Sequence, residues 1–429
     1  MILLYKVLSA FLYPFLILMI YLRKFLGKED LYRFKEKIFP SNFNIIDKQN
    51  SKLLWFHAAS IGEFKSIIPI IKQLNIQNKN FKFLITTTTL SSGNLAKVEF
   101  NNIENIYHRY FPLDVPFLIE KFLYQWRPDR IFLVDSEVWP NLILKAKNHN
   151  IPIALFNARI TAKSYNNWMM FSTTARQIFN IFKLCICSSS ETKRFLEKLN
   201  AQNIFFLGNI KFIEDIDQKK IKSINENIFL SEKFWFAAST HREEDIFCLN
   251  THLILKQKFK DIITIIAPRH IERSKTIKTL AEKMDLNAQV LNHGETILKD
   301  KQIIIINYFG ALNEFFKYAN SVFIGKSMIK RLKKVGGQNP IEAAKLNCKI
   351  YHGPYVYNFE EIYKILEKAN ISKMINNHEE LSKNLIADLE NNNQNNKKNL
   401  DSIKVYGQKT LDDTMSLLNN FISNDSNKA

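Results

Sequence analysis

The fold of this chain is decided by the stretch Leu53-Leu54-Trp55-Phe56-His57-Ala58-Ala59-Ser60-Ile61-Gly62-Glu63. Its opening apolar residues predict a buried strand, and the small residues that follow allow the backbone to turn sharply. Glu63 then stands at the start of the amphipathic run Phe64–Leu74. Because ligands of α/β proteins bind where a strand's carboxyl end leads into a helix, Glu63 is either a general base or a favourable helix-start charge. The spacing alone favours the helix-start charge.

Short apolar runs alternate with amphipathic runs along the rest of the chain. This rhythm predicts parallel strands covered by helices. The expected strands are Leu53–His57, Phe81–Thr86, Arg130–Val134, Pro152–Phe156, Leu184–Cys187, Ile204–Leu207, Phe234–Ala238, Ile262–Ala267, Gln302–Ile306 and Ser321–Ile324. The expected helices include Val115–Trp126, Pro140–Asn148 and Ser190–Leu199.

A polar, Lys-rich segment, Glu214–Asn227, interrupts the alternation. We therefore expect a linker over residues 213–232 between two Rossmann-like domains, residues 25–212 and residues 233–429. The second domain is expected to end in a helix over Leu400–Phe421. Two such α/β domains with a ligand cleft between them are the layout of GT-B glycosyltransferases, although a fold alone does not fix a function.

Residues 1–24 are predicted to form a membrane anchor. Val7–Leu22 contains no charged residue, and Met1–Tyr5 extends the apolar run beyond Lys6. A spanning helix needs about 20 apolar residues, so a single-pass or deeply embedded helix is expected. By the positive-inside rule, the basic residues directly after it predict that the rest of the chain faces the cytoplasm. These residues are Arg23, Lys24, Lys28, Arg33, Lys35 and Lys37.

The formal net charge of +19 carries little functional information, because Lys, Asn and Ile are abundant throughout the chain. The lysines are dispersed rather than gathered into a stripe with interleaved aromatic residues, so no nucleic-acid partner is expected. The sequence contains no P-loop, GxGxxG, HExxH or zinc pattern. The cysteines form no metal-binding or disulfide pattern and are expected to be buried, reduced thiols: Cys185, Cys187, Cys248 and Cys348.

Polar residues follow the predicted strands of the first half at the points where ligands bind in α/β proteins. Asp135 and Glu137 come directly after Arg130–Val134, and spacing alone favours solvated loop acids over site residues. Arg159 follows the next strand and is either an anion-binding group with paired hydrogen bonds or an ordinary surface residue. Lys211 ends this half and is one of many lysines, so the sequence alone favours a surface position.

The second half repeats this arrangement. Ala238-Ser239-Thr240-His241 is typical of a capped helix start, which can also bind phosphate. Pro268-Arg269-His270 suits recognition of an anion, although such a pair of basic residues is weakly specific. The glycines of Gly336-Gly337-Gln338-Asn339 permit close backbone approach to a ligand, with Glu342 placed to reach ribose hydroxyls. A loop hinge is the alternative interpretation of these glycines.

Taken together and in this order, the polar blocks resemble those of the Kdo (3-deoxy-D-manno-octulosonic acid) transferases of lipopolysaccharide biosynthesis. The resemblance covers nearly the whole chain, from the N-terminal apolar segment onward. Eight ordered blocks carry it: His57-Ala58-Ala59-Ser60-Ile61-Gly62-Glu63, Phe111-Pro112-Leu113-Asp114, Glu137-Val138-Trp139-Pro140, Asn157-Ala158-Arg159, Gly208-Asn209-Ile210-Lys211-Phe212, Ser239-Thr240-His241, Pro268-Arg269-His270 and Gly337-Gln338-Asn339-Pro340-Ile341-Glu342.

This resemblance implies a GT-B enzyme that transfers Kdo from CMP-Kdo to lipid IVA, the lipid A precursor, with inversion at the transferred sugar. It implies no metal and no redox cofactor. It also implies attachment to the bacterial inner membrane, with the catalytic body on the cytoplasmic side. The first domain and the basic flank of the anchor would receive the bisphosphorylated lipid acceptor.

The resemblance also implies roles for individual residues. Glu63, in the S-x-G-E motif, would be the general base, while Glu137 and Lys211 would support the charge changes of the transition state. The CMP-binding side would comprise Pro268, Arg269, His270, the turn Phe309-Gly310-Ala311, the loop Gly336-Gly337-Gln338-Asn339, and Glu342.

Three positions depart from the family pattern. Asp135-Ser136-Glu137 stands where the family often has Glu-x-Glu, Gln338 where it commonly has His, and Gly325-Lys326-Ser327 where Gly-Gly-Ser is usual. Two alternatives share the two-domain layout: a membrane-associated GT-B enzyme for another nucleotide sugar, and a nucleotide-sugar epimerase. Neither would carry both the S-x-G-E and the E-x-W-P motifs. A membrane-tethered nucleic-acid binder is the third alternative, and only the net charge suggests it.

Overall fold

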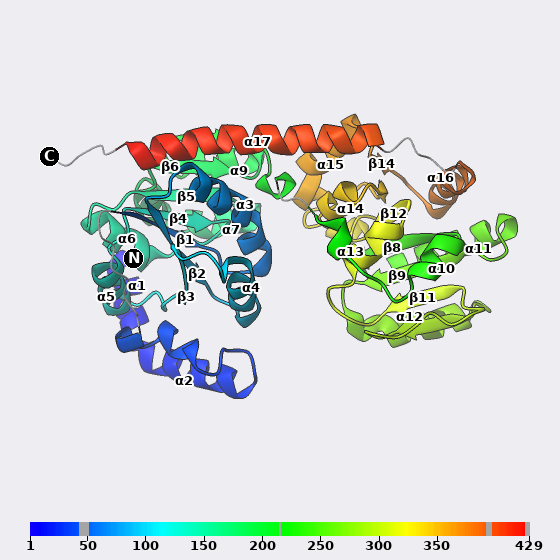
Figure 1. Cartoon of the computed structure of the whole chain (residues 1–429), viewed down its shortest axis with the longest axis horizontal. Coiled ribbons are helices and arrows are strands. Elements are labelled where there is room, and N and C mark those ends of the chain that lie inside the picture. The colour runs from blue at the N-terminus through cyan, green and yellow to red at the C-terminus, as the bar shows by residue number, and fades with distance from the viewer. Residues whose placement is uncertain (43–50, 214–215, 392–396, 425–429) are drawn as a thin grey trace. The chain divides into compact units, whose positions relative to one another are not determined.

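The computed structural model describes residues 1–42, 51–213, 216–391 and 397–424. The chain divides into two compact units, one formed by Met1–Glu214 with Gly407–Ala429 and the other by Asp215–Tyr406. Each unit is built on a seven-stranded parallel sheet flanked by helices (Figure 1). The predicted class, two α/β units with parallel sheets, is therefore confirmed.

The N-terminal unit has the strand order β3-β2-β1-β4-β5-β6-β7. Its strands are β1 (Lys52–His57), β2 (Phe81–Thr87), β3 (Ile106–Tyr110), β4 (Arg130–Val134), β5 (Ile153–Ala158), β6 (Leu184–Cys187) and β7 (Ile204–Phe206). Its helices, after two at the N-terminus, are α3 (Ile61–Gln77), α4 (Leu90–Phe100), α5 (Pro116–Trp126), α6 (Pro140–Asn148), α7 (Ala162–Met169), α8 (Ser172–Phe179) and α9 (Ser190–Lys198). The direction of strand progression reverses between β1 and β4, which is the position where open α/β sheets bind ligands.

The C-terminal unit repeats this plan with the order β10-β11-β9-β8-β12-β13-β14. Its strands are β8 (Phe234–Thr240), β9 (Ile263–Pro268), β10 (Ala288–Leu291), β11 (Ile303–Ile306), β12 (Ser321–Ile324), β13 (Lys349–His352) and β14 (Ser372–Met374). Its helices are α10 (Glu226–Ser231), α11 (Glu244–Lys258), α12 (Ser274–Glu282), α13 (Leu312–Tyr318), α14 (Ile341–Lys345), α15 (Glu360–Lys368) and α16 (His378–Glu390). Here the reversal lies between β8 and β12.

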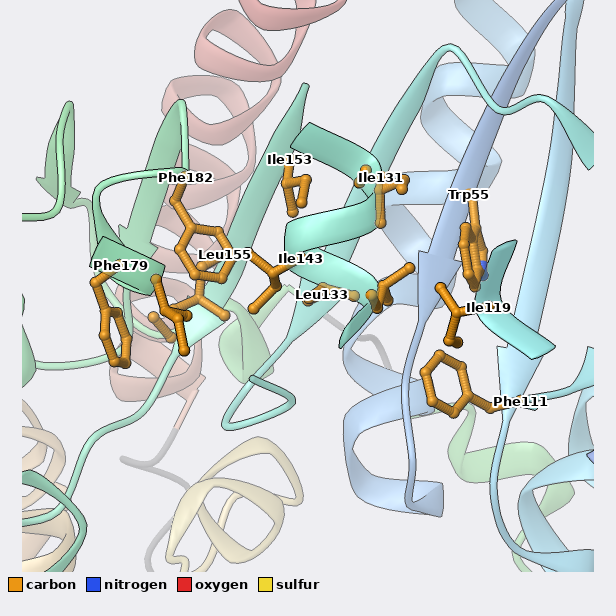
Figure 2. Close-up of a cluster of buried hydrophobic side chains, with 14 of the residues drawn as sticks. Trp55, Phe111, Ile119, Ile131, Leu133, Ile143, Ile153, Leu155, Phe179 and Phe182 are labelled. Atoms are coloured by element: carbon orange, nitrogen blue, oxygen red, sulfur yellow. The ribbon is translucent and has the colours of Figure 1, made fainter. Parts of the chain in front are cut away.

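The residues of β1 alternate between two apolar cores. Leu53 and Trp55 belong to the core on one face of the sheet, and Leu54 and Phe56 belong to the core on the other. Figure 2 shows part of the first core, where Trp55 lies beside Ile119 of α5 and above Phe111. Because both faces are covered, β1 is apolar at every position from Leu53 to Phe56, as expected of a central parallel strand.

The last helix, α17 (Lys397–Ser423), corrects the predicted domain boundary. The sequence placed this helix with the C-terminal domain, but Gly407 onward belongs to the N-terminal unit. The reason is its apolar face: Met415, Leu418 and Ile422 are buried in the core that also contains Phe56. The helix therefore completes the cover of one face of the N-terminal sheet.

Part of the predicted linker packs into the C-terminal unit. Asn225 is buried, its Oδ1 accepts the backbone N–H of Ile297 at 2.8 Å, and its Nδ2 donates to the carbonyl of Glu295 at 3.2 Å. Glu214 and Asp215, at the start of the predicted linker, lie outside the described residues. The lysines of this segment gave it the composition of a linker, although Asn225 and Phe229 within it are buried.

Two helices, α1 (Ile2–Phe11) and α2 (Tyr13–Phe25), replace the single anchor helix that the sequence predicted. Neither is long and apolar enough to cross a bilayer alone, nor is any other helix among the described residues. The two pass that test together, although the pair is bent by 55°. Pro14 explains the break, because a proline lacks the N–H that would continue the first helix and its ring clashes with the preceding turn.

One face of this helix pair is fastened to the N-terminal unit. The Tyr5 hydroxyl donates to Asp114 at 3.0 Å, and Asn141 donates to the Ser9 hydroxyl at 3.1 Å. Ile20 is buried against Phe34 and Ile38. The other face is apolar and exposed, and includes Leu3, Leu4, Val7, Leu8, Phe11, Phe15, Leu18, Leu22, Phe25 and Leu26.

Candidate functional site

Glu63 lies at the N-terminus of α3, in the loop that leaves β1. The Ser60 hydroxyl accepts the backbone N–H of Glu63 at 3.3 Å and donates to its Oε1 at 2.8 Å. Oε2 of Glu63 accepts the backbone N–H of Ala59 at 2.8 Å. This is a variant of the capping box in which the glutamate accepts the N–H of the residue before the N-cap, so the helix-start role is confirmed. The carboxylate is still only half-buried, and each of its oxygens retains a lone pair for a further proton.

Glu137 is held in the loop that leaves β4, next to β1. Its Oε2 lies 3.1 Å from Nε2 of His57 and accepts the indole N–H of Trp139 at 2.8 Å. Burial alone would raise the pKa of Glu137, but the hydrogen bond and charge of His57 and the hydrogen bond from Trp139 outweigh it and lower this pKa. Glu137 is therefore a fixed carboxylate rather than a solvated loop acid, which corrects the interpretation from spacing.

Asp135 lies among the other charged residues of this edge. Burial, reinforced by the charge of Glu63, raises the pKa of Asp135 to about 6, and Glu137 acts in the same direction. Lys211 and Arg159 oppose this rise in pKa. The other two carboxylates and the two cations thus lie close enough to act on Asp135, and the sequence-predicted residues Glu63, Glu137 and Lys211 are gathered around it.

The backbone at this edge is shaped to bring the loops together. Asp135 and Asn157 have positive φ angles, 62° and 51°, which aspartate and asparagine tolerate better than most residues. The carbonyl of Asp135 accepts the backbone N–H of Arg159 at 3.1 Å, which ties the loop after β5 to the loop after β4. The Asn209 side chain accepts the N–H of Lys211 at 3.0 Å and orders the turn that carries this lysine.

The block Phe111-Pro112-Leu113-Asp114 has a structural role. Asp114 caps α6 by accepting the backbone N–H groups of Asn141 and Leu142 at 3.0 and 2.9 Å. Burial raises the pKa of Asp114 to about 6, although these hydrogen bonds and that of Tyr5 act against the rise. Through Tyr5, the same carboxyl connects the first helix of the chain to the sheet.

In the C-terminal unit, Glu244 organises the two loops at the β8–β12 reversal. Its carboxylate is fully buried and accepts four backbone N–H groups: His241 and Lys326 donate to Oε2, and Ser327 and Met328 donate to Oε1, at 2.7–3.0 Å. Burial raises the pKa of Glu244, whereas the four hydrogen bonds lower it. Four donors leave no acceptor for a carboxyl proton, so this geometry suits the ionised form.

Cations gather on these loops. Burial lowers the pKa of His241, and the charges of Lys326, His270 and Arg273 add to this effect. The rings of His241 and His270 are 5.9 Å apart. Arg269 and His270 are exposed while Pro268 is buried, so the sequence-predicted pair is available to a ligand. Several cations around a helix-start loop make a site for an anion.

The glycines of the loop Gly336-Gly337-Gln338-Asn339 are explained by packing. A Cβ on Gly336 would collide with the carbonyl of Tyr355, and one on Gly337 would lie 3.0 Å from Cα of Val356. Gly337 also has a φ of 87°. These glycines therefore permit close approach to another backbone segment. This is a third explanation for them, beside the ligand approach and the loop hinge that the sequence suggested.

The remaining predicted residues of this unit lie on loops and a short helix. The Asn339 side chain accepts the N–H of Ile341 at 3.2 Å, and the carbonyl of Gln338 accepts the Tyr363 hydroxyl at 3.1 Å. Glu342 lies in the first turn of α14 and is half-buried. The turn Phe309-Gly310-Ala311 follows β11, with Phe309 exposed and Ala311 buried.

Sequence reasoning missed His57, Glu244 and Lys326. His57 ends a buried strand, and a polar residue at such a position is a signal that its side chain has a hydrogen-bond partner. Glu244 follows Glu243 at a helix start, so the sequence does not indicate which of the two glutamates is buried. Lys326 has a φ of 59°, and the glycine that the family usually has at this position is the signal that could have indicated it.

The fold defines a class: chains built as two α/β units with parallel sheets, in the manner of GT-B proteins. The crystal structure of the UDP-GlcNAc 2-epimerase from Neisseria meningitidis bound to UDP-GlcNAc has this fold, with a TM-score of 0.58, 14% identity, and coverage of 86% of this chain and 100% of that one. A glycosyltransferase from Rickettsia africae gives a TM-score of 0.57 at 12% identity, with coverage of 88% and 100%. These likenesses show the fold alone.

Sequence comparison identifies the family. Residues 32–214 match the model described as 3-deoxy-D-manno-octulosonic-acid transferase (kdotransferase). The 3-deoxy-D-manno-octulosonic acid transferase of Rickettsia bellii is 30% identical over 425 residues, covering 97% of this chain and 99% of the relative. That of Haemophilus influenzae is 28% identical over 323 residues, covering 73% of each. The chain belongs to the Kdo transferase family and is a glycosyltransferase.

Proposed function

We propose that this enzyme transfers Kdo from CMP-Kdo to lipid IVA with inversion at the anomeric carbon of Kdo. The observation that supports it best is the cluster of Glu63, Asp135 and Glu137 with Lys211 and Arg159 at the β1–β4 reversal. An inverting transfer needs one base, and groups that respond to changing charge, at one point. This cluster supplies both kinds of group.

In the proposed reaction, Glu63 accepts the proton of an acceptor hydroxyl as its oxygen attacks the anomeric carbon. The bond from that carbon to the phosphate oxygen breaks on the opposite face, and CMP leaves with the bonding electrons. Glu137 and Lys211 support the charge changes at the reacting sugar. The hydrogen bonds that cap α3 fix the direction of the Glu63 carboxylate before the acceptor arrives.

CMP-Kdo is proposed to bind the C-terminal unit. The cations around His241 suit its phosphate, and they include the sequence-predicted His270. Pro268, Arg269, the turn Phe309-Gly310-Ala311, the loop Gly336-Gly337-Gln338-Asn339, and Glu342 would complete this side, on the family resemblance. Glu342 would bind the ribose.

Transfer is tested with the full chain in detergent. We expect CMP release only when CMP-Kdo and lipid IVA are both present, and a lipid product heavier by whole Kdo residues in a mass spectrum. That spectrum also counts the Kdo residues added. UDP-GlcNAc serves as the control for the epimerase alternative and should be returned unchanged. Absence of CMP release, under conditions in which a related Kdo transferase is active, would overturn the proposal.

We also propose that α1 and α2 attach the enzyme to the cytoplasmic face of a bacterial inner membrane. Their exposed apolar residues face away from the unit to which the pair is fastened, and Lys24 and Lys28 follow at the end of α2. An apolar surface flanked by cations suits anionic phospholipid headgroups over an acyl layer. The 55° bend suits helices that embed in one leaflet better than one straight span.

Membrane attachment is tested by sedimentation with phosphatidylglycerol vesicles. Replacing Leu3, Phe11 and Phe15 together by serine should weaken binding at least about tenfold, because each side chain contributes about 1.5–3 kcal/mol when fully buried. Leu230→Ser, an exposed apolar residue of the C-terminal unit, is the control and should leave binding unchanged. Equal binding of the triple variant would exclude these helices as the attachment site.

A further inference from the structure

His57 is a buried titratable residue to which the proposed reaction gives no role. It ends β1 with no exposed surface, and its ring stacks on Phe111 with centroids 3.9 Å apart. Nδ1 lies 3.0 Å from the Thr86 hydroxyl and 3.1 Å from the Thr86 carbonyl, while Nε2 lies 3.1 Å from Oε2 of Glu137. The imidazole therefore connects the neighbouring strand β2 to a carboxylate of the candidate site.

The hydrogen-bond partners of His57 indicate that Nε2, the ring nitrogen that faces Glu137, carries a proton. The indole N–H of Trp55 donates to the Thr86 hydroxyl at 2.9 Å, so this hydroxyl can turn its own hydrogen toward Nδ1 of His57. The proton of a neutral ring then resides on Nε2. If Nδ1 instead donates to the Thr86 carbonyl, a neutral ring would turn the lone pair of Nε2 toward a carboxylate, which repels it; this arrangement therefore requires the imidazolium, in which Nε2 is again protonated. In both states Nε2–H donates to the carboxylate, which accepts only.

Glu137 thus receives two donors on the same oxygen. Within the described part of the chain, His57 and Trp139 both bond to Oε2, and Oε1 has no hydrogen-bond partner. We propose that His57 is a positioning residue: it fixes Oε2 of Glu137 so that Oε1 is the oxygen presented to the substrate. The proposal rests on the proposed function, because it assumes that Glu137 acts on the transferred sugar.

The orientation of the Glu137 carboxylate matters because other charged residues lie nearby. Asp135 is two residues away on the same loop, and Glu63, Lys211 and Arg159 act electrostatically on Asp135. The hydrogen bonds of His57 to Thr86 and its stacking on Phe111 hold the imidazole in place, and the imidazole in turn holds Oε2 of Glu137.

The test compares two replacements of His57 in the full-length enzyme. His57→Leu removes the donor at similar volume, whereas His57→Gln places an amide N–H near the former Nε2. We expect His57→Leu to lower kcat by roughly 10²-fold, as small misplacements in active sites do, and His57→Gln to recover much of this loss. Because His57 holds the pKa of Glu137 down, the acid limb of the kcat–pH profile should move to higher pH in His57→Leu.

His252 offers a matched control. It is equally buried, and its Nδ1 lies 2.8 Å from the Thr264 hydroxyl, but its Nε2 has no partner among the described residues. His252→Leu should therefore lose stability to a similar extent without moving the pH profile. An unmoved acid limb in His57→Leu, or a His57→Gln variant no better than His57→Leu, would reduce His57 to a packing role and overturn the proposal.

A second measurement separates this proposal from the proposed function. In protein with ¹⁵N-labelled histidines, the ring-nitrogen signals of His57 are the ones that are absent from the spectrum of His57→Gln. Glu137→Gln should shift these His57 signals and leave those of His252 in place. If the wild type transfers no Kdo, the proposed function fails, and these signals still test the contact. Unshifted signals would overturn the proposal even in an active enzyme.

Discussion

Replacing Glu63 by Gln is expected to lower turnover by roughly 10²–10⁴-fold while the fold and CMP binding persist. The structure indicates that this substitution changes the chemistry of the side chain while the N-terminus of α3 stays capped. Glutamine serves as well as glutamate in a capping box, so its amide oxygen can still accept the N–H of Ala59 and keep α3 capped. What the variant loses is the charge and the ability to accept a proton. Steady-state CMP release, with CMP affinity measured by calorimetry, separates chemistry from binding.

A matched control exists at the start of α16. There the Asn377 side chain accepts the N–H of Glu380 at 2.8 Å, and Glu380 accepts the N–H of Asn376 at 2.9 Å, which is the same capping geometry. Glu380→Gln should leave turnover unchanged. If Glu63→Gln also retains near-normal turnover, Glu63 is a helix cap and another group takes the proton.

Replacing Glu244 by Gln is expected to destabilise the C-terminal unit by about 2–6 kcal/mol and to weaken CMP binding at least tenfold. The amide nitrogen would face two of the four N–H donors, and each buried donor left without an acceptor costs about 1–3 kcal/mol. The two loops that carry His241 and Lys326 would separate. Urea unfolding followed by tryptophan fluorescence, together with CMP titration, measures both effects.

Glu243→Gln is the control for this prediction. Glu243 precedes Glu244, and its carboxylate is exposed and paired with Arg331 at 2.9 Å. An exposed pair of this kind contributes at most about 1 kcal/mol, so this variant should match the wild type in CMP affinity. Equal behaviour of the two variants would mean that other contacts hold the loops.

The sequence predicted most inner strands of both sheets and the edge strand β7, and it missed the edge strands β3, β10 and β14 and the inner strand β13. β1, β4 and β12 each contain a run of three or four buried apolar residues, so their bounds were found to within a residue. β3, with the sequence Ile-Tyr-His-Arg-Tyr, lies at one edge of its sheet, and β14, Ser-Lys-Met, lies at an edge of the other. Edge strands are covered less, so they carry polar residues and lose the pattern that identifies them.

Much of the candidate site could not be derived from spacing. Glu63 and Glu137 are far apart in the chain, and their loops lie at the same edge of the sheet because β1 pairs with β4. Local sequence patterns do not predict this strand order. The roles of Gly336 and Gly337 depended on which backbone packs against them. The bend after Phe11, in contrast, could have been predicted from Pro14. The apolar composition of the segment led instead to the prediction of a single helix.

The position of α17 has a consequence for how the protein is made. Its residues from Gly407 onward complete the apolar cover of the N-terminal sheet, where Leu418 and Ile422 meet the side of β1 that carries Phe56. The first unit to leave the ribosome therefore lacks part of its core until the last residues of the chain emerge. A nascent chain would carry an open apolar face throughout synthesis of the second unit, and such a face makes an incompletely folded chain prone to aggregation.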